Sequence, residues 1–190
     1  MGMEPLDALA AASSTFTSVL DLVGPDQLVR ATPCVDWDVR GLVSHVLIGD
    51  QMTGALLDGA SQEQAMALWG QEFGDDVVDR CRVSVADQLA RMRAVDDWDL
   101  VVHHIVGDVP ASQLLQFRIG DLTLHAWDLA TAVGADVVIP GDLAERIYES
   151  MLPMAPFIGE MGIFGSGPSG TVPDDAPITL RLLDFTGRRP

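Results

Sequence analysis

The chain has 190 residues and a mass of 20.3 kDa, which suits one globular domain with a sizeable core. Hydrophobic residues make up 48% and charged residues 21%, so neither a disordered chain nor a membrane protein is expected. Acidic residues outnumber basic ones by 28 to 11, giving a net charge of −17, and all the basic residues are arginines. A surface this acidic repels nucleic-acid backbones, and a chain without lysine forms neither a Schiff base nor a P-loop.

We expect no targeting segment from the sequence. The N-terminus lacks a basic region, and no run of about 18 apolar residues occurs, so we expect neither a signal peptide nor a membrane span. Cys34 and Cys81 form no CxxC motif. Reduced thiols and a cytoplasmic location are therefore expected.

The N-terminal half predicts a series of helices. Apolar residues recur at helical spacing from residue 5, and Gly24 belongs to a Gly-Pro-Asp stop signal after the first helix. Asp38 is a suitable N-cap for the second helix. The predicted helices cover, in chain order, residues 5–23, 38–58, 61–72 and 75–95.

The C-terminal half predicts a strand and further helices. Residues 99–107 favour an extended crossing, and Pro110 suits the first turn of a helix that ends at Gly134. Beyond it we predict a helix over 142–161 bent by prolines, an irregular segment over 162–176, and a short helix or extended piece over 177–185. Four long helices with a long crossover favour a helix bundle. We assign residues 1–161 to the bundle and 162–190 to an extension packed on the same domain.

A stripe of polar residues follows one face of the predicted helix over 110–133. At 100° per residue, Arg118, Asp121, His125 and Asp128 share an arc of roughly 80°, with apolar residues on both sides. Asp121 and His125 are four residues apart, a spacing that suits two ligands of one metal ion. An ion pair between Arg118 and Asp121 beside a surface histidine is the alternative that this periodicity leaves open.

His45 lies on an apolar seam of the second predicted helix. Gly41 and Gly49 stand four residues before and after it, and glycine inside a helix costs roughly 1 kcal/mol. One interpretation is that they clear space around the imidazole, and the other is close helix packing around a core histidine. His45, Asp121 and His125 would form a set of two histidines and one carboxylate with an open position, which suits zinc, with nickel and iron as alternatives.

His103 and His104 are adjacent in the predicted strand. Successive strand residues point to opposite faces, so the two imidazoles are poorly placed to share a metal ion. A structural role is favoured, although one of them could act as a general acid or base.

Two sequence blocks together resemble a known family. The block Thr32-Pro33-Cys34-x-x-Trp37-x-Val39-Arg40-x-Leu42-x-x-His45 resembles the opening of the second helix in the mycothiol-dependent maleylpyruvate isomerase N-terminal family. The block Asp121-x-x-x-His125-x-Trp127-Asp128-Leu129-Ala130 resembles the metal-binding helix of that family. The C-terminal residues 181–188 are similar to an uncharacterised actinobacterial subfamily.

The resemblance implies an all-α fold, a DinB-like four-helix bundle that holds a divalent metal, usually zinc, on His45, Asp121 and His125. The family commonly has glutamate where this chain has Asp121. The implied function is a metal-dependent enzyme that uses a low-molecular-weight thiol such as mycothiol, as an S-transferase or isomerase acting on a small electrophilic substrate. Asp128 would orient an imidazole, and Arg118 would bind an anionic group of the substrate or hold Asp121.

A second function remains open at this point. The same bundle could serve as a non-catalytic metal-binding or regulatory module in which the metal is absent or structural. A closed site with a fourth protein ligand, such as His103 or His104, would favour the structural role. The superfamily resemblance also implies a homodimer. Neither hypothesis includes a nucleic acid or a membrane as a partner.

Overall fold

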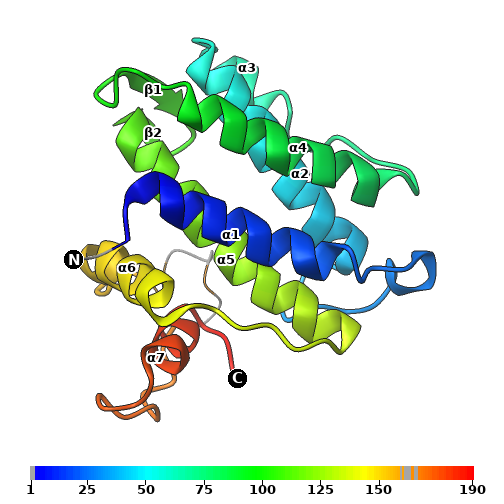
Figure 1. Cartoon of the computed structure of the whole chain (residues 1–190), viewed down its shortest axis with the longest axis vertical. Helices are drawn as coiled ribbons and strands as arrows, with labels where there is room; N and C mark the ends of the chain where they lie inside the picture. The colour runs from blue at the N-terminus through cyan, green and yellow to red at the C-terminus, as the bar shows by residue number, and fades with distance from the viewer. Residues whose placement is uncertain (1–2, 159, 161–163, 165–166) are drawn as a thin grey trace. The chain divides into compact units, whose positions relative to one another are not determined.

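The computed structural model describes residues 3–158, 160, 164 and 167–190. Within these residues the chain is mostly helical, with seven α-helices and one two-stranded antiparallel sheet (Figure 1). No described helix has both the length and the apolar character that a membrane crossing requires. The predicted all-α class is confirmed.

The contacts within the chain divide it into two compact units. The larger is Pro5–Val137, and the smaller combines Met1–Glu4 with Val138–Pro190. Within the smaller unit, the helix after residue 140 packs against the C-terminal helix. The domain boundary expected at residue 161 stays a prediction. Every residue singled out as a candidate ligand belongs to the larger unit.

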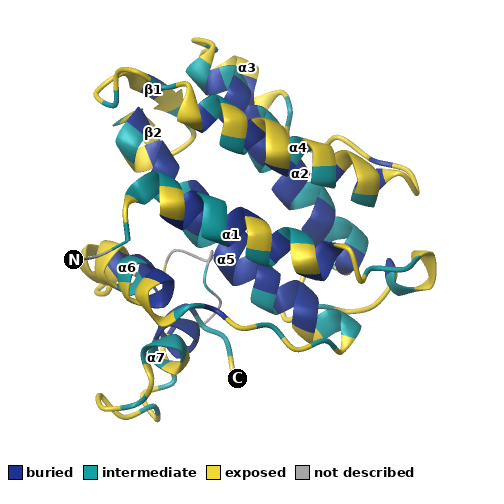
Figure 2. Ribbon diagram, in the orientation of Figure 1, coloured by how far each residue is buried: buried dark blue, intermediate teal, exposed yellow. Residues whose placement is uncertain are grey.

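Four long helices form the larger unit. They are α1 (Pro5–Leu20), α2 (Val39–Leu57), α4 (Val77–Arg93) and α5 (Ala111–Val133). Helix α1 packs against α4 and α5, and α2 packs against the same two helices, so the order around the bundle is α1, α4, α2, α5. The buried faces of these helices meet in the middle of the unit (Figure 2). The four predicted long helices and their bundle are therefore confirmed.

Capping residues set the ends of the two helices that carry the candidate ligands. Helix α2 begins after Asp38, whose carboxylate accepts a hydrogen bond of 2.8 Å from the backbone N–H of Gly41. Helix α5 begins after Pro110 and ends at Gly134, which adopts a left-handed conformation with φ of 74°. Both ends lie close to the predicted positions.

The connections between the long helices differ more from the prediction. A 3₁₀ turn, Pro25–Gln27, follows α1, and helix α3 covers only Gln62–Met66 instead of residues 61–72. The expected extended crossing is a hairpin of β1 (Val101–His104) and β2 (Gly107–Pro110). Gly107, with φ of 117°, allows the tight return that the prediction did not include.

The smaller unit contains α6 (Gly141–Met151), a 3₁₀ turn (Leu152–Met154) and α7 (Ile178–Phe185). Helix α6 is shorter than the predicted helix over 142–161, because proline at position 153 has no backbone N–H to continue it. Residue 161 and residues 162, 163, 165 and 166 lie outside the described part. The described residues of the expected irregular segment, 164 and 167–176, form no helix or strand.

Candidate metal centre

Helices α2 and α5 bring the three predicted ligands together. His45 lies in the second turn of α2, and Asp121 and His125 lie one turn apart in the middle of α5. The Nε2 atom of His45 is 3.2 Å from Oδ1 of Asp121, and Nε2 of His125 is 3.4 Å from the same oxygen. One potential ligand atom from each residue lies within 4.8 Å of the other two. The donor set of two imidazole nitrogens and one carboxylate oxygen suits a divalent transition metal.

Electrostatic interactions within this cluster shift the pKa values of Asp121 and His125. Burial raises the pKa of Asp121, but Arg118, His125 and His45 together lower it well below its usual range. Burial lowers the pKa of His125, but Asp121 and the hydrogen bonds to Asp121, Asp128 and Cys34 raise it well above its usual value. These contacts therefore favour the ionised form of the Asp121 carboxylate and the protonated form of the His125 imidazole.

Asp128 fixes the orientation of His125. Its Oδ2 atom lies 2.9 Å from Nδ1 of His125, and both side chains are buried. An Nδ1–H that donates to a carboxylate leaves the lone pair of Nε2 for a metal. The contact agrees with the orienting role expected for Asp128, whose part in catalysis stays a prediction.

Cys34 also lies at the site, although it was not among the predicted site residues. Its thiol donates to Oδ2 of Asp128 at 3.4 Å, and its Sγ atom lies 4.0 Å from Nδ1 of His125. Cys34, His125 and Asp128 also form a second group with the spacing of metal ligands. The signal that could have indicated this position is the place of Cys34 in the block that ends at His45.

Two tryptophans enclose His45. The ring of Trp37 stacks on the imidazole with 4.4 Å between centroids, and Trp69 meets it edge-on at 5.7 Å. A Cβ atom on Gly41 would lie 3.2 Å from Cβ of Trp37. Gly41 thus makes room for Trp37, not for the imidazole as one interpretation of the sequence had it.

Arg118 faces the carboxylate and is buried. Its Nη1 atom lies 2.7 Å from Oδ2 of Asp121, and its Nη2 atom lies 2.8 Å from Oδ1 of Asp50. A Cβ atom on Gly49 would collide with Nη1 of Arg118. The absence of a side chain at Gly49 therefore makes room for Arg118, and not for His45. Of the two roles expected for Arg118, holding Asp121 has a contact in the structure, and contact with a substrate remains a prediction.

The other two histidines lie apart from this cluster. His103 is exposed and its Nδ1 atom is 2.7 Å from Oδ1 of Asp108, while the ring of His104 is 5.1 Å from that of Phe117. Burial and the charge of Arg118 lower the pKa of His104. Neither belongs to a possible ligand group among the residues that the structure describes.

Comparison with known proteins identifies the family. A model of the mycothiol maleylpyruvate isomerase N-terminal domain matches residues 9–130. The chain belongs to this family. Uncharacterised proteins from two strains of Mycobacterium tuberculosis are 28% identical to it over 188 residues, which is 98% of this chain and 98% of each relative.

Solved structures of a family member share the fold. The mycothiol-dependent maleylpyruvate isomerase superposes with a TM-score of 0.66 and 21% identity, covering 81% of this chain and 71% of the isomerase. A histidine-to-alanine mutant of that isomerase gives a TM-score of 0.65 and 21% identity, covering 86% and 72%. The bundle expected from the resemblance is thereby confirmed as the fold of this maleylpyruvate isomerase-like chain.

Proposed function

We propose that His45, Asp121 and His125 bind one divalent metal ion, with zinc as the first candidate and nickel or iron as alternatives. The observation that carries the proposal is the convergence of both Nε2 atoms on the single oxygen Oδ1 of Asp121. Three protein ligands leave a coordination position for an exogenous group, as in catalytic zinc sites. A metal bound there would stabilise the deprotonated form of a thiol at neutral pH.

Neighbouring side chains hold each of the three proposed ligands in a fixed orientation. Asp128 orients His125, Arg118 fixes Oδ2 of Asp121, and Trp37 covers one face of the His45 ring. Each ligand is therefore held by a neighbour on its own helix or in the loop before α2. Such support reduces the reorganisation that metal binding and catalysis would otherwise require.

We infer that the protein uses a low-molecular-weight thiol of the mycothiol type on a small electrophilic substrate, as an S-transferase or an isomerase. Membership of the family supports the thiol, since the solved family member is named for its dependence on mycothiol. The thiolate sulfur would form a bond to an electrophilic carbon of the substrate. In a transfer reaction the leaving group departs with its bonding electrons, and in an isomerisation the thiol is released again.

The location and assembly expected from the sequence are part of this proposal. The free cysteines Cys34 and Cys81 agree with a reducing cytoplasm, where small thiols are available. A homodimer rests on the superfamily resemblance and stays a prediction. In the non-catalytic alternative the metal is absent or structural, and a fourth ligand from His103 or His104 would favour the structural role. Among the described residues neither histidine belongs to the ligand group, so this observation favours an open site.

The experiment that tests this function measures conjugation of mycothiol to chlorodinitrobenzene. Zinc-loaded protein is compared with chelator-stripped protein and with zinc-treated His45→Ala, and His103→Ala serves as the histidine control. We expect conjugation above the uncatalysed rate only for loaded wild type and His103→Ala. Equal rates for loaded protein, stripped protein and His45→Ala would contradict the proposal.

A further inference from the structure

Arg118 connects the candidate metal centre to a second carboxylate, which is buried. Its guanidinium donates to Oδ2 of Asp121 at 2.7 Å and to Oδ1 of Asp50 at 2.8 Å. Arg118 is 6% exposed and Asp50 is 3% exposed. Burying the two charged groups of Arg118 and Asp50 is costly, and such a buried ion pair is often no more stable than apolar residues of the same volume. The arrangement therefore calls for a role beyond stability.

Asp50, the partner of Arg118 away from the candidate metal centre, is itself held by a residue of another helix. Asp50 lies on α2, and the side-chain amide of Gln88 on α4 donates to the same Oδ1 atom that Arg118 contacts. Gln88 is 1% exposed. The carboxylate of Asp50 is thus fixed by helices α4 and α5, and in turn it fixes the direction of the guanidinium.

Gly49 provides the space that the guanidinium occupies. A Cβ atom at this position would collide with Nη1 of Arg118 and lie 3.0 Å from its Cζ. Glycine within a helix is unfavourable relative to alanine, so its presence in the middle of α2 needs a reason. The close approach of Arg118 supplies that reason.

We propose that Asp50 is a positioning residue for the metal centre, acting through Arg118 on Asp121. With Oδ2 of Asp121 held by Arg118, Oδ1 faces the imidazoles of His45 and His125. Asp50 also neutralises the buried guanidinium, which would otherwise repel a divalent cation at the neighbouring ligands. The inference rests on the proposed metal site and adds the residue that controls its affinity.

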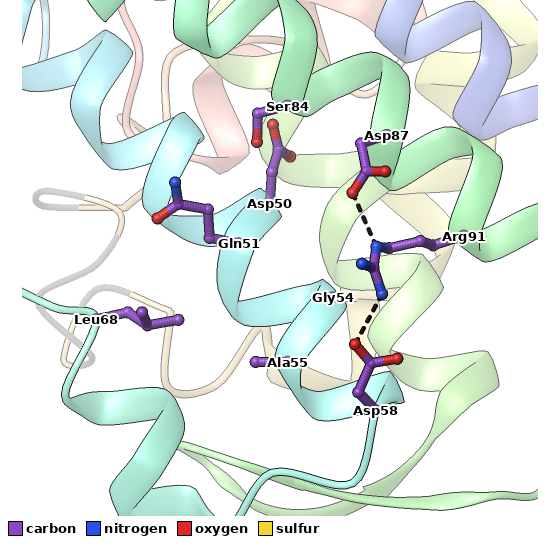
Figure 3. A pocket seen from close by; sticks show the side chains of 9 residues that line it. All are labelled: Asp50, Gln51, Gly54, Ala55, Asp58, Leu68, Ser84, Asp87 and Arg91. Carbon is purple, nitrogen blue, oxygen red and sulfur yellow. Dashed lines mark hydrogen bonds and ion pairs between the residues drawn. The ribbon is translucent and has the colours of Figure 1, made fainter.

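A cavity beside Asp50 offers a matched control. Its volume is about 390 Å³, and Asp50, Asp87 and Arg91 contribute to its lining between α2 and α4 (Figure 3). Asp87 lies 2.8 Å from Nε of Arg91, so it also pairs with an arginine at this cavity. None of the three proposed metal ligands lines the cavity. Asp87→Asn therefore removes a carboxylate partner of an arginine without touching the connection to Asp121.

The test measures the Zn²⁺ dissociation constant of chelator-stripped full-length protein by competition with a chromophoric chelator. We expect Asp50→Asn to weaken Zn²⁺ binding about 10- to 100-fold, the usual effect of losing a residue that supports a metal ligand. Asp87→Asn should bind as the wild type does. The visible spectrum of Co²⁺-loaded protein should change in Asp50→Asn and stay unchanged in Asp87→Asn, a readout that loss of stability alone would not move.

A pair of glycine variants repeats the test without removing a charge. Gly49→Ala should weaken Zn²⁺ binding, because its methyl group displaces Arg118. Gly54→Ala is the control on the same helix, since its Cβ would lie 3.3 Å from Cδ of Arg91. Alanine favours the helix at both positions, and the group that the Gly49→Ala methyl meets is the far end of a long side chain that can shift. Circular dichroism checks that each variant is folded before its Zn²⁺ affinity is compared.

The outcomes separate this inference from the metal site itself. Suppose that His125→Ala abolishes Zn²⁺ binding, as the metal site requires. If Gly49→Ala or folded Asp50→Asn then binds Zn²⁺ with wild-type affinity, the proposed role of Asp50 is wrong. Equal affinity of wild type, Asp50→Asn and His125→Ala would instead refute the metal site. If Asp50 acts through Arg118, the effects of Asp50→Asn and Arg118→Met on Zn²⁺ affinity will be non-additive in the double variant.

Discussion

The Nδ1 atom of His125 lies 2.9 Å from Oδ2 of Asp128, one turn further along α5, and both residues are buried. This pair determines which nitrogen of His125 faces Asp121. A histidine whose second nitrogen donates to a carboxylate is a more basic metal ligand with a fixed ring orientation. The strength of metal binding should therefore depend on the charge of Asp128.

Asp128→Asn is expected to weaken Zn²⁺ binding about 10- to 100-fold, because a neutral amide supports the imidazole less well than a carboxylate. Competition with a chromophoric chelator measures the change. Asp108→Asn is the matched control, since Asp108 also pairs with a histidine, the exposed His103, at 2.7 Å. If the two variants bind Zn²⁺ equally well, Asp128 does not support the metal ligand.

The buried carboxylate of Asp50 should make stability depend on pH. Burial raises its pKa from 3.8 to about 6, although the charge of Arg118 opposes the shift. Between these two pH values the folded state binds more protons at Asp50 than the unfolded state does, so the contribution of this group to stability falls as pH rises. The total loss, complete only between a pH well below 3.8 and one well above 6, is roughly 3 kcal/mol, of which about 2 kcal/mol falls between pH 4 and 6.5.

Urea unfolding of wild type and Asp50→Asn across this range measures the effect. Because the other titrating groups are common to both proteins, the stability of wild type relative to the variant should fall as pH rises from 4 to 6.5. A difference that stays constant over this range would show that Asp50 titrates alike in the folded and unfolded states.

The bundle core should be sensitive at Phe16, which is fully buried on α1. Phe16→Ala removes a large side chain from the centre of the unit, and we expect it to lower the free energy of unfolding by about 3–5 kcal/mol. Val83→Ala on α4 is the control, because Val83 is 70% exposed, and its change should stay within about 0.5 kcal/mol. Comparable losses in both would contradict the packing described for α1.

Much of the fold and part of the site followed from local sequence patterns. The pair Asp121 and His125 could be predicted because both residues lie on α5, where their separation depends only on helical geometry. His45 lies on another helix, and its meeting with this pair depends on which faces of α2 and α5 pack together. Its glycine neighbours and the family resemblance were the signals that connected it to the site.

The residues that hold the proposed ligands in place could not be predicted from local sequence patterns. Asp50 is one of 28 acidic residues, and only the packing of α2 against α4 and α5 separates it from the solvated ones. Of the two interpretations of Gly49, space for His45 or close helix packing, the structure favours the second, because the space is occupied by Arg118 from the neighbouring helix. The hairpin was also missed, because pairing of β1 with β2 depends on the turn at Gly107 and not on the apolar pattern.

The central claim is that His45, Asp121 and His125 bind one divalent metal ion. Elemental analysis of protein purified without chelators and then dialysed against Zn²⁺ tests it directly, with His125→Ala and His103→Ala treated alike. We expect about one metal ion per chain in the wild type and in His103→Ala, and none in His125→Ala. A wild type that takes up no metal, or a His125→Ala variant that retains a full equivalent, would contradict it.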